Sequence, residues 1–342
     1  MKKRQFKWAC ILGMLLAMLS APSAQANVPV SEAFTSLEPR MENAQYHAQM
    51  CISADVEYPN LLNDAVTVYS ASLIPLYSQC DLSIFSASDV VKEDKDEAMG
   101  ALILDFEDGS WINMTDKGSI YYFGVNGIKC SQMLDRAGDY AVEWKEDFPL
   151  SVEEAGRRTM EQVEKMGIPY CAVADRQAYA ENQSGVDPGF AFGRIQLKQM
   201  VDGIPFAQSL LHLTEPDAFV VGNILFFTLT EQGFEIIDVF GAYENCVPLY
   251  QVKEIASLPE ALDTLNAYLD TFFAAREGIP DLEIFRIAFE YVPYRTNPWE
   301  EDAAEYEVIP AWYFGVRRAG SSRYAASFDF CVSAIDGKML VY

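Results

Sequence analysis

The chain has 342 residues, of which 50% are apolar and 13% aromatic, and it carries 50 acidic against 25 basic residues for a net charge of −25. A surface this acidic repels nucleic acid and anionic lipid headgroups, which argues against both as binding partners. The apolar content argues against a disordered chain, and the length is that of about two domains.

Residues 1–26 have the pattern of a secretory signal peptide. Basic residues precede an apolar stretch from Trp8 to Leu19, and a small-x-small triplet predicts cleavage after Ala26. The apolar stretch is shorter than the ~20 residues that a membrane-spanning helix needs, and no later stretch reaches that length. The sequence therefore predicts an exported protein, extracellular or in the cell envelope, whose mature chain has no membrane span.

Six cysteines would remain in the mature chain: Cys51, Cys80, Cys130, Cys171, Cys246 and Cys331. An exported chain can oxidise them, but the sequence selects no pairing. We expect at most one or two disulfide bridges. None of the six has the C-x-x-C spacing of a zinc knuckle or a thioredoxin-type redox site, so neither site is predicted.

Residues 27–145 are predicted to form a β-rich N-terminal domain. Apolar residues alternate around 50–56 and 65–76, which is the period of a half-buried strand. The run WINMTDKGSIYYF, residues 111–123, predicts two strands joined by a glycine turn. No comparable helix pattern precedes this run. The segment is therefore either a degenerate copy of the units described next or a separate domain that ends near Trp144.

Residues 146–250 are predicted to form a first unit of helix and sheet. Ser151 and Glu154 have the spacing of a capping box, in which each side chain satisfies a free backbone N–H of the first helical turn. An apolar stripe follows at helical spacing: Val152, Ala155, Met160, Val163 and Met166. Gly167 and Pro169 then end the helix, and apolar strand patterns follow.

Residues 251–342 are predicted to form a second unit with the same landmarks. Ser257 and Glu260 have the capping spacing, and Gly278 and Pro280 end the helix. The apolar stripe between them is longer: Leu258, Ala261, Leu262, Leu265, Tyr268, Leu269, Phe272 and Phe273. A strand with one strongly apolar face comes next.

The landmarks of the two units recur in one order at nearly one interval. Gly-Ile-Pro follows the helix pattern in both, at 167–169 and 278–280. The matching pairs lie 104 to 111 residues apart: Glu154 and Glu260, Gly167 and Gly278, Pro205 and Pro310, Gly233 and Gly337. This recurrence predicts an internal duplication. The expected fold class is α+β, with two tandem units, each a helix packed on an antiparallel sheet, preceded by the β-rich N-terminal domain.

The two units resemble the PepSY-like modules of exported bacterial proteins. The shared features are Glu-Ala near the start of the helix, a glycine at its end and a final turn of the type A-x-D-G-x-hydrophobic. The tail EVIPAWYFGV (307–316) followed by FDFCVSAIDGKMLVY (328–342) is similar to the C-terminal ends of YycH/YycI-type envelope regulators and related secreted families of unknown function.

This resemblance implies a fold of tandem PepSY-like units and a non-enzymatic role. The implied partner is a peptide, a peptidase or a membrane-bound signalling protein outside the cell. PepSY modules commonly carry Asp-Ala and Thr-Gly at the final turn, whereas Ser333-Ala334 and Asp336-Gly337 stand there in this chain. No ligand-binding residue is therefore carried over from the family.

The sequence holds no pattern of a reaction centre, and we predict no catalytic, cofactor-binding or metal-ligating residues. The two histidines, His47 and His212, stand far apart and outside any metal-binding motif. A nucleophile elbow, a phosphate loop and a dinucleotide fingerprint are all absent. Acidic runs at 93–97 and 300–305 lack the alternating spacing of a calcium loop, so a solvated surface is the favoured interpretation and calcium binding the alternative.

The predicted partner contacts lie near the C-terminus: Trp299, Glu300, Glu301 and Trp312. Trp299 stands beside a proline and an acidic run, which is typical of an exposed contact residue. The predicted function is a secreted or envelope-associated, non-enzymatic binding or regulatory protein that engages a protein or peptide. Strand addition to an exposed sheet edge would suit this role. The alternatives are a peptidase inhibitor or chaperone-like module and, less favoured, a carboxylate-dependent hydrolase with acidic residues converging in a deep pocket.

Overall fold

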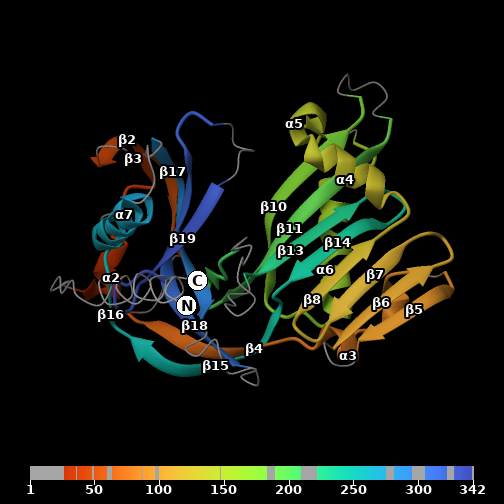
Figure 1. The fold of residues 1–342 in the computed structure, drawn as a ribbon, viewed down its shortest axis with the longest axis horizontal. Coiled ribbons are helices and arrows are strands. Elements are labelled where there is room, and N and C mark those ends of the chain that lie inside the picture. The colour runs from red at the N-terminus through yellow and green to blue at the C-terminus, as the bar shows by residue number, and fades with distance from the viewer. Residues whose placement is uncertain are drawn as a thin grey trace, which may run out of the picture.

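The strands of this protein form two large sheets that lie side by side (Figure 1). The structure is a computed structural model that describes residues 27–35, 37–47, 50–59, 64–86, 88–96, 100–146, 148–182, 189–208, 222–274, 281–294, 305–321 and 327–340. Residues 40–73 contribute strands to the seven-stranded sheet, residues 90–240 to the ten-stranded sheet, and residues 243–333 again to the seven-stranded sheet. The lobe of the ten-stranded sheet is therefore an insertion within the other lobe.

The ten-stranded sheet is antiparallel throughout. Its strands in spatial order are β5 (Val90–Asp96), β6 (Ala101–Phe106), β7 (Trp111–Thr115), β8 (Ser119–Phe123), β14 (Phe234–Phe240), β13 (Ile224–Leu229), β11 (Ala191–Val201), β10 (Cys171–Ala180) and β9 (Ala141–Val142), with β12 (Ile204–Pro205) paired to β11. Two meanders, β5 to β8 and β10 to β14, thus meet at the β8–β14 pair.

Helices cover one face of the ten-stranded sheet and one end of its opposite face. The amphipathic helix α6 (Val152–Lys165) packs Ala155 and Val163 against Ile195 and Leu197 of β11. The short helices α3 (Leu76–Gln79) and η1 (Leu82–Ile84) add to the same core. Helices α4 (Gly127–Asp135) and α5 (Ala137–Tyr140) lie across one end of the opposite face (Figure 1).

The seven-stranded sheet combines strands from both ends of the chain. Its order is β15 (Tyr243–Val252), β4 (Val66–Leu73), β18 (Glu305–Arg318), β17 (Leu282–Tyr294), β3 (Met50–Glu57) and β2 (Arg40–His47), with β19 (Ser327–Ser333) paired to β18. The β3–β17 pair is parallel. Helix α7 (Leu258–Ala274), helix α2 (Val30–Ala33) and the small β1 (Val28–Pro29) and β16 (Glu254–Ile255) sheet close one face over a large apolar core.

The predicted α+β class is wrong, because the protein is mostly β. Of the residues that the structure describes, 51% lie in strands and 21% in six α-helices and one short 3-10 helix. A helix followed by an antiparallel meander does occur in both predicted units, as α6 with β10 to β14 and as α7 with β17 to β19. Neither meander forms a sheet of its own, so the fold is not a tandem array of PepSY-like helix-on-sheet units.

The physical reason is that both meanders have edges that other strands cover. An open edge leaves backbone donors and acceptors unpaired, and here β8 pairs with β14 while β3 pairs with β17. Residues 27–145 supply these added strands to both sheets instead of forming a sheet of their own. The predicted boundaries near 145 and 250 accordingly do not coincide with the division between the two sheets.

Local signals in the sequence do match local structure. The Ser151 hydroxyl accepts a hydrogen bond from the Glu154 backbone N–H at 3.2 Å, and Gly167 adopts the left-handed conformation with φ of 71°. The predicted turn residues Gly278 and Pro280 lie outside the described residues. Within the described ranges, no helix combines the length and the apolar character that crossing a membrane requires.

Candidate functional site

A hairpin of the ten-stranded sheet crosses to the other sheet and builds the junction between them. β11 and β12 are joined by Asp202-Gly203, both with positive φ, which is the two-residue turn that suits a tight hairpin. Beyond the turn, Ile204 and Phe206 are buried in the core of the seven-stranded lobe. The Ala207 N–H donates to the Tyr291 carbonyl at 2.8 Å. This bond fixes the hairpin and the residues that follow it, which we call the β11–β12 arm, to β17.

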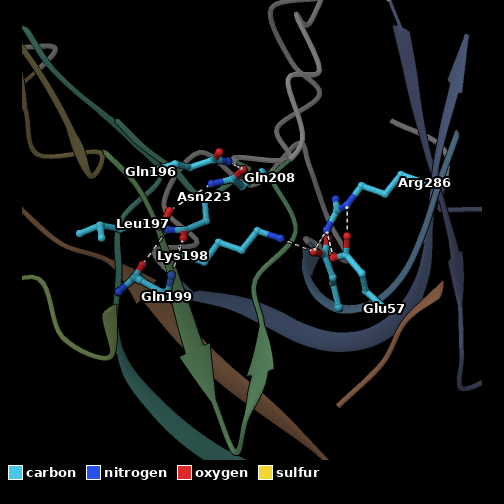
Figure 2. Close-up of polar contacts among 9 residues, drawn as sticks. Glu57, Gln196, Leu197, Lys198, Gln199, Gln208, Asn223 and Arg286 are labelled. Atoms are coloured by element: carbon cyan, nitrogen blue, oxygen red, sulfur yellow. Dashed lines mark hydrogen bonds and ion pairs between the residues drawn. The ribbon is translucent and has the colours of Figure 1, made fainter. Parts of the chain in front are cut away.

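Four charged side chains form a chain of ion pairs at this junction (Figure 2). Lys198 Nζ on β11 donates to Glu290 Oε1 on β17 at 2.6 Å, and Arg286 Nη2 donates to the same oxygen at 2.7 Å. Arg286 also contacts Glu57 of β3 at 2.8 Å. The Glu290 side chain is 0% exposed, whereas that of Glu57 is 56% exposed. The network therefore runs from solvent to a buried carboxylate.

The charged groups of this network neutralise one another. Burial opposes the charge of Arg286, but Glu290 and Glu57 outweigh that effect and raise its pKa. Burial likewise opposes ionisation of Glu57, yet the hydrogen bonds and charge of Arg286 hold its pKa below the usual range. The Arg286 guanidinium also lies 4.8 Å from the centre of the Tyr313 ring. Buried charges require such pairing, so the arrangement fits a fixed structural link between the sheets.

Buried amides complete the junction next to these charges. The Gln199 side chain donates to the Tyr243 carbonyl at 2.7 Å and accepts from the Tyr243 N–H at 2.8 Å. Asn223 donates to Gln199 Oε1 at 2.8 Å and to the Gly241 carbonyl at 3.0 Å. Gln199 also donates to the carbonyl of Pro169, the proline of the first Gly-Ile-Pro run, at 2.9 Å. The network fixes the point where the chain returns to the seven-stranded sheet.

The face of the ten-stranded sheet opposite α6 carries aromatic and planar polar side chains, and we call it the aromatic face. Cross-strand pairing places its members in two adjacent rows: Asn113, Tyr121, Asp238, Phe226 and Gln196 in one, and Trp111, Phe123 and Arg194 in the other. All eight side chains are partly exposed. The Trp111 ring lies 5.4 Å from Tyr121 and 5.7 Å from Phe123, measured between ring centres.

The strand β15 forms an edge of the seven-stranded sheet with unusual surface chemistry. Among the described strands it pairs with β4 alone. Val247, Leu249 and Tyr250 are 54%, 51% and 46% exposed, although they are large and apolar. Natural edge strands are commonly protected by charge, proline or bulges. Here Pro248 and two register irregularities are present, but the apolar side chains stay accessible.

A surface hollow of 440 Å³ lies beside α4 and α5. Three of its four charged side chains form ion pairs, since Lys129 contacts Glu181 at 2.8 Å and Arg136 contacts Asp139 at 2.7 Å, and the fourth is Asp135. Within the described ranges, no three His, Cys, Asp or Glu side chains lie close enough together to hold a metal ion.

Of the four predicted partner contacts, the structure describes only Trp312, and it places this residue in the core. Trp312 is fully buried, donates its ring N–H to the Ala256 carbonyl at 2.9 Å and packs edge-on against Phe289, so it is a core residue and not a contact residue. Its aromatic neighbours in sequence mislead because β18 is apolar on both faces. Trp299, Glu300 and Glu301 lie outside the described residues.

The remaining predicted features fall on ordinary surface or core. The six cysteines that were expected to form at most one or two bridges are all free thiols. In the first acidic run, the β5 residues are exposed and Glu93 pairs with Lys95 at 2.5 Å, which matches the solvated-surface interpretation. His212 and the second acidic run from 300 to 304 lie outside the described residues, and His47 ends β2.

Sequence reasoning did not single out Glu290, Lys198 or the aromatic face. Glu290 did carry a signal, because a lone carboxylate inside the apolar run FRIAFEYV must be paired if the strand is buried. Its partner Lys198 carried none, since the two residues stand 92 positions apart and in different predicted units. The rows of the aromatic face depend on the β8–β14 pairing, which joins residues more than a hundred positions apart.

Comparison with known proteins identifies a fold and no family. No protein-family model and no curated protein matches the sequence. Among solved structures, the crystal structure of an uncharacterized protein from Eubacterium rectale ATCC 33656 at 1.45 Å resolution is similar. The match covers 87% of this chain and 92% of that chain with a TM-score of 0.60 and 14% sequence identity. At this identity, the likeness establishes that the two proteins share a fold.

Proposed function

We propose that this chain is an exported, non-enzymatic binding protein that engages an extended, basic segment of a protein or peptide partner along β15. The observation that carries the proposal is the combination of an edge backbone, paired on one side by β4, with the exposed apolar side chains of Val247 and Leu249. The signal-peptide pattern of residues 1–26 supports an extracytoplasmic location for the encounter.

Strand addition explains why the occupant would be a polypeptide. A free sheet edge offers backbone donors and acceptors at the repeat of an extended chain, and alternate side chains of the incoming strand give specificity. Pro248 lacks an N–H, so an added strand would form its ladder on the residues to either side of it. Val247 and Leu249 would supply apolar contacts beside that ladder.

Charge selects a basic partner segment. Glu244 shares a cross-strand row with Ser72 and Glu305, and Val247 shares the next row with Ser70 and Glu307. Carboxylates therefore lie on the same face as the exposed valine. With a net charge of −25 for the chain, long-range attraction also favours a cationic partner and would raise its association rate.

Selection from a phage-displayed library of random peptides tests the proposal without a known partner. We expect the protein to enrich peptides in which apolar residues alternate with Lys or Arg. Leu249→Lys should abolish the enrichment, because it replaces an apolar contact in the docking strand with a positive charge that repels a basic segment. Val91→Lys is the matched control, since Val91 is 63% exposed on β5, an edge strand of the other sheet. Absence of any enriched pattern, or equal enrichment by the Leu249→Lys variant, would refute strand addition at β15.

A further inference from the structure

The aromatic face differs from β15 in what it can offer a ligand. Its strands β7, β8, β14, β13 and β11 are paired on both sides within the ten-stranded sheet. Their backbones have no free edge, so an occupant would be recognised by side chains alone. The side chains in question are aromatic rings and planar amide, carboxylate and guanidinium groups.

Rings and planar polar groups alternate along the first row of the aromatic face. Asn113 is the cross-strand neighbour of Tyr121, Tyr121 of Asp238, Asp238 of Phe226 and Phe226 of Gln196. A sugar ring has one surface of C–H groups and a rim of hydroxyls that both donate and accept hydrogen bonds. Its C–H surface packs on an aromatic ring, and amides or carboxylates bind adjacent hydroxyls in a bidentate manner.

The charges of the aromatic face favour a neutral occupant. Arg194 lies over the Phe226 ring at 4.0 Å, and its positive charge acts on Asp238. Burial raises the pKa of Asp238 and the charge of Arg194 opposes that rise, while burial lowers the pKa of Arg194. The two groups neutralise each other, so a charged ligand gains little there. The net charge of −25 further disfavours anionic polysaccharides.

We propose that the aromatic face binds a neutral oligosaccharide, with sugar rings packed on Trp111 and Tyr121 and hydroxyls bound by Asn113 and Asp238. This site is separate from the docking strand β15, and its occupant is of a different chemical class. The protein would then hold a polypeptide at one sheet and a glycan at the other.

A glycan microarray that carries neutral, amino-sugar and uronic-acid oligosaccharides tests the proposal directly. We expect retention on neutral oligosaccharides and none on uronic acids. In calorimetric titrations with the best neutral ligand, Trp111→Ala and Asn113→Ala should each weaken the affinity by about tenfold, the loss that follows from one ring contact or one bidentate hydrogen bond. Circular dichroism would verify that both variants keep the fold.

Two control variants separate this proposal from the proposed function. Tyr250→Ala and Leu249→Lys on β15 should leave glycan affinity unchanged, even if peptide enrichment is lost. Retention on uronic acids alone, no retention on any neutral glycan, or equal affinity in the Trp111→Ala and Asn113→Ala variants would overturn the inference. Any of these outcomes would leave the peptide proposal standing.

Discussion

Lys198 of the ten-stranded sheet donates to Glu290 of the seven-stranded sheet at 2.6 Å, and this ion pair lies where the two lobes meet. The same β11–β12 arm brings Asp202 to the hydroxyl of Tyr69 on β4 and Phe206 into the core around Tyr291. Polar and apolar contacts of one hairpin thus fix the relative position of the two lobes, and with it the separation between β15 and the aromatic face.

Removal of the lysine should destabilise this junction. In Lys198→Met the buried Glu290 keeps Arg286 but loses its second cation, and we expect the free energy of unfolding to fall by about 3 kcal/mol. Urea denaturation followed by circular dichroism would measure it. Lys95→Met is the control, because the exposed Lys95–Glu93 pair should contribute less than about 1 kcal/mol. Equal losses in the two variants would show that the junction pair is energetically an ordinary surface contact.

The buried amide network should be even less tolerant of truncation. Asn223→Ala leaves the Gly241 carbonyl and part of the Gln199 amide without partners inside the protein, and we expect a loss of about 3 kcal/mol. Asn266→Ala removes a partly exposed amide on α7 and should change stability by less than about 0.5 kcal/mol. A loss in Asn223→Ala no larger than in Asn266→Ala, in thermal or urea unfolding, would contradict a role for the network in fixing the chain at Tyr243.

The sequence predicted what depends on neighbours along the chain. The cap at Ser151, the left-handed glycine at Gly167 and the β7–β8 hairpin around Gly118 were readable because each is set within a few residues. The assembly of sheets was not readable, because it depends on pairings such as Ile52 with Ile284, more than two hundred residues apart. Alternation of apolar residues identifies a strand but carries no information about which strand lies beside it.

The same limit applies to the candidate sites. Exposure of Val247 and Leu249 follows from β15 being an edge, which only the sheet order reveals. Trp312 looked like a contact residue because aromatics are common in interfaces, yet β18 is central in its sheet and buries the indole completely. The PepSY-like and envelope-regulator resemblance stays a prediction for function, whereas the tandem-unit fold drawn from it is replaced by the two shared sheets.

Two glycines should respond in opposite ways to the same substitution. A Cβ at Gly193 would lie 2.2 Å from the Trp144 ring. The Trp144 indole N–H donates to the Leu150 carbonyl at 2.7 Å, so this ring is held in place. Gly193→Ala should therefore lower stability by about 2 kcal/mol or more. Gly156 stands inside α6 with no atom near its Cβ position, and Gly156→Ala should raise stability by about 0.5–1 kcal/mol. Parallel thermal unfolding of both variants would check the signs, and a destabilised Gly156→Ala variant would contradict the open surroundings of that helix face.

Alkaline pH should weaken the arm that joins the lobes through Tyr69. Burial, together with the hydrogen bond to the Asp202 carboxylate, raises the pKa of Tyr69 to about 12 from the ordinary value of 10.0. The folded state therefore holds the phenol proton more tightly than the unfolded state does. This contribution to stability is fully present below pH 10 and is lost as the pH rises towards 12.

Urea denaturation of the wild type and of Tyr69→Phe between pH 8 and 12 would isolate this titration. Tyr69→Phe should begin with lower stability at pH 8, because the hydrogen bond to Asp202 is gone, but its stability should fall less steeply above pH 10, because phenylalanine does not ionise. Asp202→Asn keeps the phenol while removing the carboxylate charge, so its slope should lie between the other two. Parallel curves for all three proteins would mean that the loss at high pH arises elsewhere and that the Tyr69–Asp202 contact does not carry the pH dependence of the junction.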